Sequence, residues 1–160
     1  MKKVIAFALS LMLALSLFAG CGKSGSSSTA EQANLEGSLE EILAKVYDGI
    51  TEMPMTMEQE LTEDNSEYNV GVARSEYVEG LASDAAINAI AFSVCLMRAE
   101  SAEAAQTLAE QVEEKANPNK WVCVEAESKI VDRIGDVVIL IMADQTLADQ
   151  LSDNFKALAG

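Results

Sequence analysis

The sequence predicts one α+β domain: a four-stranded antiparallel sheet built from two strand–strand–helix units, with its helices packed on one face and an additional N-terminal helix. Two observations predict this class. The segments 86–100 and 128–144 are apolar enough to contain inner strands. Each is followed at once by a segment with helical periodicity that opens with acidic residues. The element order therefore repeats a strand–strand–helix unit, and two such units make one sheet.

The predicted domain begins with a helix over 38–50. Ser38, followed three residues later by Glu41, is a capping-box pattern that marks a helix start. Pro54 lies beyond the end, where a helix cannot continue. The apolar side chains recur at helical spacing and define one face, made of Leu39, Ile42, Leu43, Val46, Tyr47 and Ile50.

Residues 53–72 show no clean period and are predicted to form a loop, with a helical turn near 58–63. Methionines alternate at its start, and an acidic run follows. Methionine side chains repack around varied partners, so they indicate an adaptable binding surface. The competing interpretation is that they fill a gap in the core beneath the loop. The candidate partner surface consists of Met53, Met55, Met57 and Tyr68, flanked by acids that would prefer a basic partner.

The first two strands are predicted at 75–83, which has weak strand character, and within 86–100. Ser83 and Asp84 are expected to turn the chain between them. The second segment is apolar or small on both sides of an extended chain, which is typical of an inner strand. One side carries Ile90, Phe92, Val94 and Leu96, and the other carries Ala91, Ser93, Cys95 and Met97.

The second half of the domain is predicted to start with a helix over 101–116, which the Asn-Pro-Asn segment ends. The stretch 121–126 is ambiguous. Residues 128–144 have the pattern of a hairpin that turns at Gly135 and Asp136. The last helix is predicted over 145–158, burying Leu147, Leu151, Phe155 and Leu158.

The N-terminus has the layout of a secretory signal peptide over residues 1–20. Lys2 and Lys3 form a positive start, an apolar run follows, and Ala19-Gly20 supplies small residues before a possible cleavage point. The alternative is a membrane-spanning anchor. The apolar run is about 15 residues long, which is shorter than the roughly 20 that a spanning helix needs.

The ending "LFAGC" resembles the lipobox of bacterial lipoproteins, and this resemblance implies cleavage before Cys21 and a lipid on its thiol. Two or three acyl chains together anchor a protein stably to a membrane. Residues 21–35 are rich in serine and glycine and have the composition of a flexible tether. The single domain is then expected to occupy residues 36–160, on the outer face of the cell membrane.

Charge and composition exclude several classes of protein. The chain has 26 acidic residues against 11 basic ones, and a net charge of −15 is repelled by nucleic-acid phosphates, so no nucleic-acid partner is expected. There is no histidine, which excludes a Ser-His-Asp or Cys-His catalytic site. Cys95 and Cys123 lie among apolar neighbours and are predicted to be buried, reduced thiols, although a disulfide remains open.

The acidic run contains Glu58, Glu60, Glu63, Asp64 and Glu67. Calcium loops place such oxygen ligands at alternating positions around a glycine bend, and the glycine is missing here. A solvated acidic loop is therefore the favoured interpretation. No metal and no cofactor are assigned.

Three longer stretches carry a family resemblance: "AIAFSVCLMRAESAEAA", "SKIVDRIGDVVILIMAD" and "DNFKAL". With the lipobox and the serine-rich tether, they resemble small bacterial lipoproteins that carry the domain of unknown function numbered 4358. The resemblance spans about residues 36–158. Its motifs are hydrophobic strands and a glycine turn, so it implies a fold and an address without implying any catalytic residue.

Three function classes follow. The favoured one is an anchored binding or interaction module for a protein or a small ligand, because the sequence contains a tether and a compact domain but no catalytic constellation. The alternatives are a structural component of the envelope and an enzyme that uses carboxylate chemistry. We expect the protein not to be an enzyme. A large exposed apolar patch would favour binding, whereas a cleft of converging acids would favour catalysis.

Overall fold

The structure, a computed structural model, describes residues 34–160. The predicted signal peptide, Cys21 and nearly all of the predicted tether lie outside the described residues. The described part contains one five-stranded antiparallel sheet with strand order β1-β2-β3-β5-β4. The strands are β1 (Thr56–Glu60), β2 (Glu79–Ala85), β3 (Ser93–Arg98), β4 (Ser128–Ile134) and β5 (Val137–Ala143).

Four α-helices and one short 3₁₀ helix accompany the sheet. They are α1 (Leu39–Val46), α2 (Ser66–Val70), η1 (Arg74–Glu76), α3 (Ala102–Lys115) and α4 (Gln145–Ala157). Among the described residues, none of the helices has both the length and the hydropathy needed to cross a bilayer. The α+β class and the antiparallel sheet are confirmed, and the predicted number of four strands is wrong by one.

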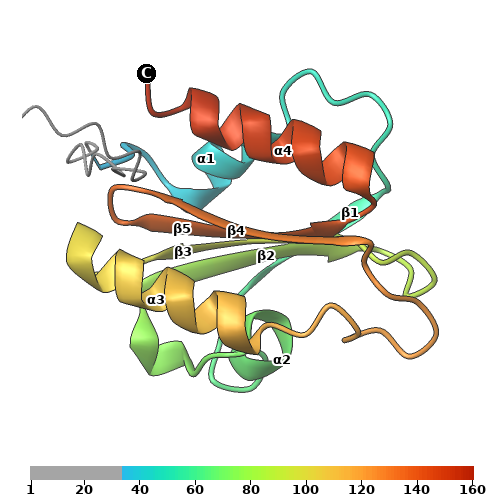
Figure 1. Cartoon of the computed structure of the whole chain (residues 1–160), viewed down its shortest axis with the longest axis horizontal. Helices are drawn as coiled ribbons and strands as arrows, with labels where there is room; N and C mark the ends of the chain where they lie inside the picture. The colour runs from blue at the N-terminus through green and yellow to red at the C-terminus, as the bar shows by residue number, and fades with distance from the viewer. Residues whose placement is uncertain (1–33) are drawn as a thin grey trace, which may run out of the picture.

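The helices cover both faces of the sheet, which corrects the prediction that they pack on one face. Helices α1 and α4 lie above the sheet in Figure 1, and α2 and α3 lie below it. The cause is visible in the inner strands. In β3, Val94 and Leu96 belong to the core under α1 and α4, whereas Cys95 and Met97 belong to the core under α3. A strand that is apolar on both sides needs cover on both sides.

The two predicted strand–strand–helix units are present. The first is β2-β3-α3 and the second is β4-β5-α4, and they join through pairing of β3 with β5 at the centre of the sheet. Gly135 has a φ of 55°, a left-handed conformation that glycine adopts without steric cost, at the turn between β4 and β5. The helices of the two units pack on opposite faces of the sheet. The unit therefore repeats in chain order, but its helix does not lie on the same face each time.

The predicted capping box at the start of α1 is confirmed, and the structure adds side-chain caps at two other helices. The Ser38 hydroxyl accepts from the Glu41 amide, and the Glu41 carboxylate accepts from the Ser38 amide, which completes the predicted capping box of α1. Ser101 caps α3 and Asp144 caps α4 through their side-chain oxygens.

Two predictions about the first strands are wrong. Ser83 and Asp84 do not form a turn, because both lie inside β2 and pair with Val94 and Ser93 of β3. The chain turns later, over 86–92. The first predicted strand also begins too early, since Arg74 to Glu76 form the 3₁₀ helix η1 and β2 starts at Glu79.

The segment 53–72, predicted as a loop, contains β1 and α2. Four of the five side chains of β1 are exposed, so the strand lacks the alternation of buried and exposed residues that reveals a strand in sequence. Pairing with β2 along its whole length is what makes it a strand. It forms one edge of the sheet.

Candidate binding surface

The four residues predicted as a partner surface fall into two groups. Met53 is half-buried and packs against the core under α1 and α4, so it does not contribute an exposed surface. Met55, Met57 and Tyr68 are 82%, 65% and 58% exposed and are among the most exposed large apolar side chains of the described chain. We call Met55, Met57 and Tyr68 the methionine surface.

Two residues of the methionine surface, Met57 and Tyr68, line a hollow of about 250 Å³ on the α2 side of the sheet. Met57 belongs to the edge strand β1, and Tyr68 belongs to α2. The side of the hollow away from β1 is made by the end of β2, the following turn and the segment after α3. The lining residues are Met57, Glu58, Gln59, Tyr68, Asp84, Ala85, Ala86, Asn88, Lys120 and Trp121.

Lys120 forms the floor of this hollow. Its side chain is only 2% exposed. The Nζ ammonium donates to Asp84 Oδ1 at 2.8 Å, to Asn69 Oδ1 at 2.8 Å and to Ser93 Oγ at 3.0 Å. These three acceptors match the three N–H donors of an ammonium group. The buried charge is thus paired and fully hydrogen-bonded, which is the condition under which a buried charge is tolerated.

Two aromatic rings complete the surroundings of Lys120. Its Nζ lies 5.4 Å from the centre of the Tyr68 ring and 5.2 Å from that of the Trp121 ring, both within cation–π range. The Tyr68 hydroxyl also donates to the Lys120 carbonyl at 3.0 Å. The exposed ring of Tyr68 is therefore held in place by its polar end, which makes it a rigid part of the methionine surface.

Lys120 and Trp121 were not predicted as site residues. Both belong to the "NPNKWVC" segment, which forms neither a helix nor a strand in the structure. A lysine beside a tryptophan in an otherwise acidic chain is a weak signal. Nothing in the sequence places it against Asp84, Asn69 and Ser93, which lie 36, 51 and 27 positions away.

The two cysteines do not pair in the structure. Cys95 is buried at the centre of the sheet, as predicted, but Cys123 is exposed, which corrects the prediction that both are buried. The segment 121–126 turns Trp121 inward, while Val122 is 98% exposed and Cys123 follows it outward. Burial raises the pKa of the Cys95 thiol to about 11, which keeps it neutral and unreactive.

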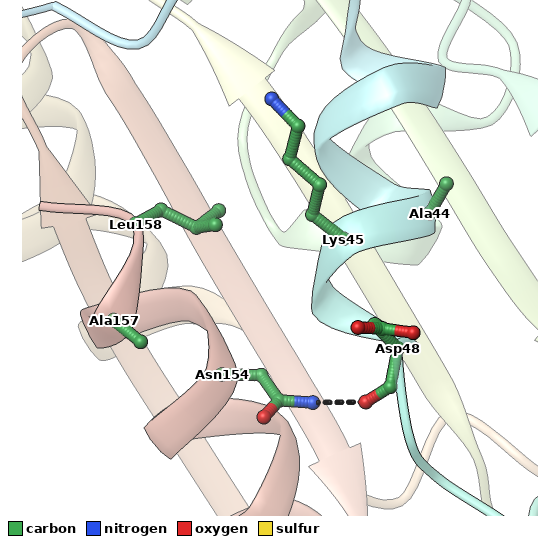
Figure 2. A pocket seen from close by; sticks show the side chains of 6 residues that line it. All are labelled: Ala44, Lys45, Asp48, Asn154, Ala157 and Leu158. Atoms are coloured by element: carbon green, nitrogen blue, oxygen red, sulfur yellow. Dashed lines mark hydrogen bonds between the residues drawn. The ribbon is translucent and has the colours of Figure 1, made fainter. Parts of the chain in front are cut away.

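A larger hollow of about 440 Å³ lies on the opposite face of the sheet, between the C-terminal ends of α1 and α4 (Figure 2). Asn154 of α4 donates there to the carbonyls of Val46 and Asp48, at 2.8 and 2.9 Å. These bonds satisfy carbonyls that the end of α1 leaves without a helical partner. Lys45 and Leu158 extend along the rim. These hydrogen bonds hold α1 and α4 together, so we regard this hollow as part of the packing between the two helices and not as a binding site.

Two kinds of site can be checked among the described residues: a cluster that could hold a metal ion, and a free acid in the hollow. Within residues 34–160, no three cysteine or acidic side chains come together as a group that could hold a metal ion. In the hollow, the Asp84 carboxylate is bound by Lys120 on one oxygen and by Gln59 Nε2, at 3.1 Å, on the other. Both of its oxygens are thus engaged in structural hydrogen bonds.

Comparison of the chain with family models, with curated proteins and with solved structures gives no match.

Proposed function

We propose that this protein is a lipid-anchored binding module on the outer face of the cell membrane, with a protein or small-ligand partner that docks on the methionine surface. The observation that carries the binding proposal is the exposure of Met57 and Tyr68 at one hollow, with the exposed Met55 two residues before Met57 at the start of an edge strand. Exposed apolar side chains gathered in one place mark interaction sites more often than singly scattered ones do.

The membrane address in this proposal is supported by the sequence alone. A positive start, an apolar run and the small residues before Cys21 follow one another in the order of a lipoprotein signal. Membership of the lipoprotein family with the domain of unknown function 4358 is likewise proposed from the stretches quoted above.

A binding role is favoured over the two alternatives by the state of the polar groups in the hollow. Lys120 has its three donors occupied, and Asp84 has both oxygens engaged. Neither group is available to transfer a proton, which argues against a carboxylate-based enzyme at this place. A purely structural envelope component would need no exposed methionines, so the same surface argues against that alternative.

The address is tested with Cys21→Ser. Because the lipid is proposed to sit on this thiol, the variant should lose radioactive palmitate label and should leave the membrane fraction or accumulate uncleaved. Cys123→Ser is the matched control, since it removes another exposed thiol, and it should remain labelled and membrane-bound. Label that persists in Cys21→Ser would show that the proposed anchor is wrong.

The binding role is tested by replacing Met55 and Met57 together with threonine, which keeps a high preference for strands. Exposed substitutions usually change stability by less than about 0.5 kcal/mol, so the fold should be retained. Capture of envelope proteins by the full chain should fall strongly. Val78→Thr is the control, because Val78 is 53% exposed but lies at the other end of β2. Equal capture by both variants would remove the methionine surface from the proposal.

A further inference from the structure

The chemistry of the partner can be inferred from the outward side of β1, and this inference rests on the proposed role as a binding module. The Met55 carbonyl accepts from the Ala86 amide at 2.8 Å, and the Leu61 amide donates to the Gly80 carbonyl at 2.9 Å. Both pairs follow the register that aligns β1 with β2. In an antiparallel ladder such bonded pairs alternate with unbonded ones. The intervening residues, Thr56, Glu58 and Glu60, therefore turn their amides and carbonyls away from β2.

The outward groups of β1 have little cover within residues 34–160. The Glu60 carbonyl accepts from Asn65 Nδ2 at 3.0 Å. In the described part of the chain, the backbone groups of Thr56 and Glu58 have no such partner outside the sheet. This row of donors and acceptors is what an added strand pairs with. We call this outward side of β1 the open edge.

The two faces beside the open edge differ in chemistry. Glu58 and Glu60 stand opposite Ser83 and Leu81 in the ladder, and Leu81 faces the core under α1. The acidic side chains therefore line the α1 side of the sheet. A groove of about 180 Å³ continues there between α1 and the edge, and its lining includes Glu40, Glu60 and Glu79. Glu79 is paired with Arg98, which leaves the other acids to attract a cation.

The other face beside the open edge carries Met57 and the Tyr68 ring together with polar side chains such as Gln59. Met57 and Gln59 stand opposite Asp84 and Ala82, and Ala82 faces the core under α3. Met57 thus points to the side that holds the hollow and the Tyr68 ring. A strand added to β1 would place every second side chain against this face, because successive side chains alternate across a sheet.

We propose that the open edge binds, by strand addition, an extended segment of a partner protein in which basic and apolar side chains alternate. Backbone hydrogen bonds to Thr56 and Glu58 supply affinity in this mode of recognition, and alternate side chains supply specificity. Lysine or arginine meets Glu58 and Glu60 on one face, and an apolar side chain meets Met57 and Tyr68 on the other.

Charge makes a partner protein a better occupant than a second copy of this chain. Pairing of two β1 strands by their open edges about Glu58 would set that carboxylate opposite its own copy. Like charges directly opposite one another destabilise a strand pair. The net charge of −15 adds a general repulsion between copies.

The inference is tested with the full chain in detergent and a short synthetic peptide in which lysine and valine alternate, by fluorescence anisotropy. Two control peptides separate the contributions: one carries glutamate in place of lysine, and one is methylated on alternate backbone amides. We expect methylation to weaken binding about tenfold or more, since several backbone hydrogen bonds are lost. The glutamate peptide should not bind, and salt should weaken the lysine peptide.

The protein side is tested with Glu58→Lys combined with Glu60→Lys, which should bind the glutamate peptide and lose the lysine peptide. Glu110→Lys combined with Glu114→Lys on the exposed face of α3 makes the same change in net charge and should leave binding as it was. Strand addition would be overturned if the methylated peptide bound as tightly as the unmethylated one. It would also be overturned if both double variants changed peptide binding to the same extent, because binding would then depend on net charge alone. The methionine-surface capture test would still stand on its own in that case.

Two further outcomes would also overturn the inference. Failure of every peptide to bind would mean that Glu58 and Glu60 serve only to discourage edge pairing. The second outcome is a dimer of the parent chain, detected by sedimentation, that is absent in Glu58→Pro while no peptide binds to either chain. It would mean that the open edge pairs with a second copy of this chain. Proline is suited to this position because the Glu58 amide points away from β2, so its removal spares the ladder.

Discussion

The two edge strands of the sheet differ in how far helices cover their faces. Strand β4 lies between α3 and α4, which pack on its two faces, and six of its seven residues are half-buried. Its charged side chains are drawn to those helices: Lys129 lies 3.8 Å from Glu113 of α3, and Asp132 lies 3.9 Å from Lys156 of α4. Strand β1 packs chiefly on β2 and is exposed along almost all of its length.

This difference in side-chain exposure is one reason for proposing that β1, and not β4, is the strand that binds a partner. Exposed strand edges invite pairing with other chains, and proteins usually cover or shorten them. In this chain α3 and α4 pack on the faces of β4, whereas β1 is short, acidic on one face and carries methionine on the other. An exposed edge strand carries a risk of unwanted pairing with other chains. A binding role for β1 would explain why this risk is tolerated, and we therefore propose that β1 is the binding strand.

The largest effect that would test the comparison is in the core beside β4. Leu140 is fully buried in β5 and stands opposite Val131 of β4 and Cys95 of β3. Leu140→Ala should lower the free energy of unfolding by about 2–5 kcal/mol, because it removes buried contacts and leaves a cavity. Met57→Thr on β1 should change it by less than about 0.5 kcal/mol. Urea unfolding measures both, and equal losses would erase the distinction between the edges.

A second effect concerns the floor beneath the methionine surface. Lys120→Met should cost on the order of 3 kcal/mol, because it leaves the Asp84 carboxylate and two buried acceptors without their donor. The value stays at the low end of the range for buried pairs, since the Asp84 side chain is 19% exposed. Lys129→Met on β4 is the matched control and should cost less, because its ion pair with Glu113 is near the surface and the carbonyls of Glu113 and Ala116 that it bonds lie at the exposed end of α3.

The outcome that contradicts this prediction is equally specific. If Lys120→Met were as stable as Lys129→Met, the buried lysine would contribute little beyond its packing. The hollow would then have to be supported by Trp121 and by the Tyr68 hydroxyl bond alone.

The smallest effect lies between the two edges and depends on pH. Burial raises the pKa of the Cys95 thiol from 9.0 to about 11. Above about pH 9 the unfolded chain loses this proton while the folded chain keeps it, so stability should fall as pH rises toward 11. The contribution is on the order of 2 kcal/mol. Burial also raises the pKa values of Tyr47 and Tyr77, which add to the same decline.

The Cys95 share is isolated by comparing slopes rather than stabilities. Cys95→Ala should show a shallower fall in the free energy of unfolding between about pH 9 and 11 than the parent chain does. Cys123→Ala, which removes an exposed thiol, should keep the parent slope. A Cys95→Ala slope that equals the parent slope would mean that the thiol ionises without opening the core.

Much of the fold could be predicted because its signals are local. The capping box of α1 and the turn at Gly135 each depend on residues within four positions of one another. The helical periodicity of α3 and α4 and the apolar run of β5 were also sufficient to locate those elements within two residues. Of the proposed surface, Met55, Met57 and Tyr68 could be selected from the sequence, since alternating methionines beside acids are unusual.

The wrong predictions share one cause. The structure of each segment depends on contacts with residues that are far away in the sequence. Strand β1 exists through its ladder with β2, some 20–30 residues away, and its own side chains show no strand pattern. Met53 differs from Met55 because the core under α1 reaches the first and not the second. Strand β3 is apolar on both of its sides, and this pattern already predicts helices on both faces of the sheet. The prediction that all helices pack on one face did not use this signal.

By itself, the sequence determined the class of the fold, the bounds of α3 and α4 to within one residue, the hairpin at Gly135 and the acidic character of the chain, whereas the helix predicted over 38–50 ends already at Val46. Only the tertiary structure decided which edge strand has exposed side chains, which face each helix covers and how the hydrogen bonds of Lys120 are satisfied. The physical reason is range. Capping, periodicity and turn conformation depend on neighbours along the chain, whereas edge exposure and the burial of a charge depend on segments that meet only when the sheet has formed.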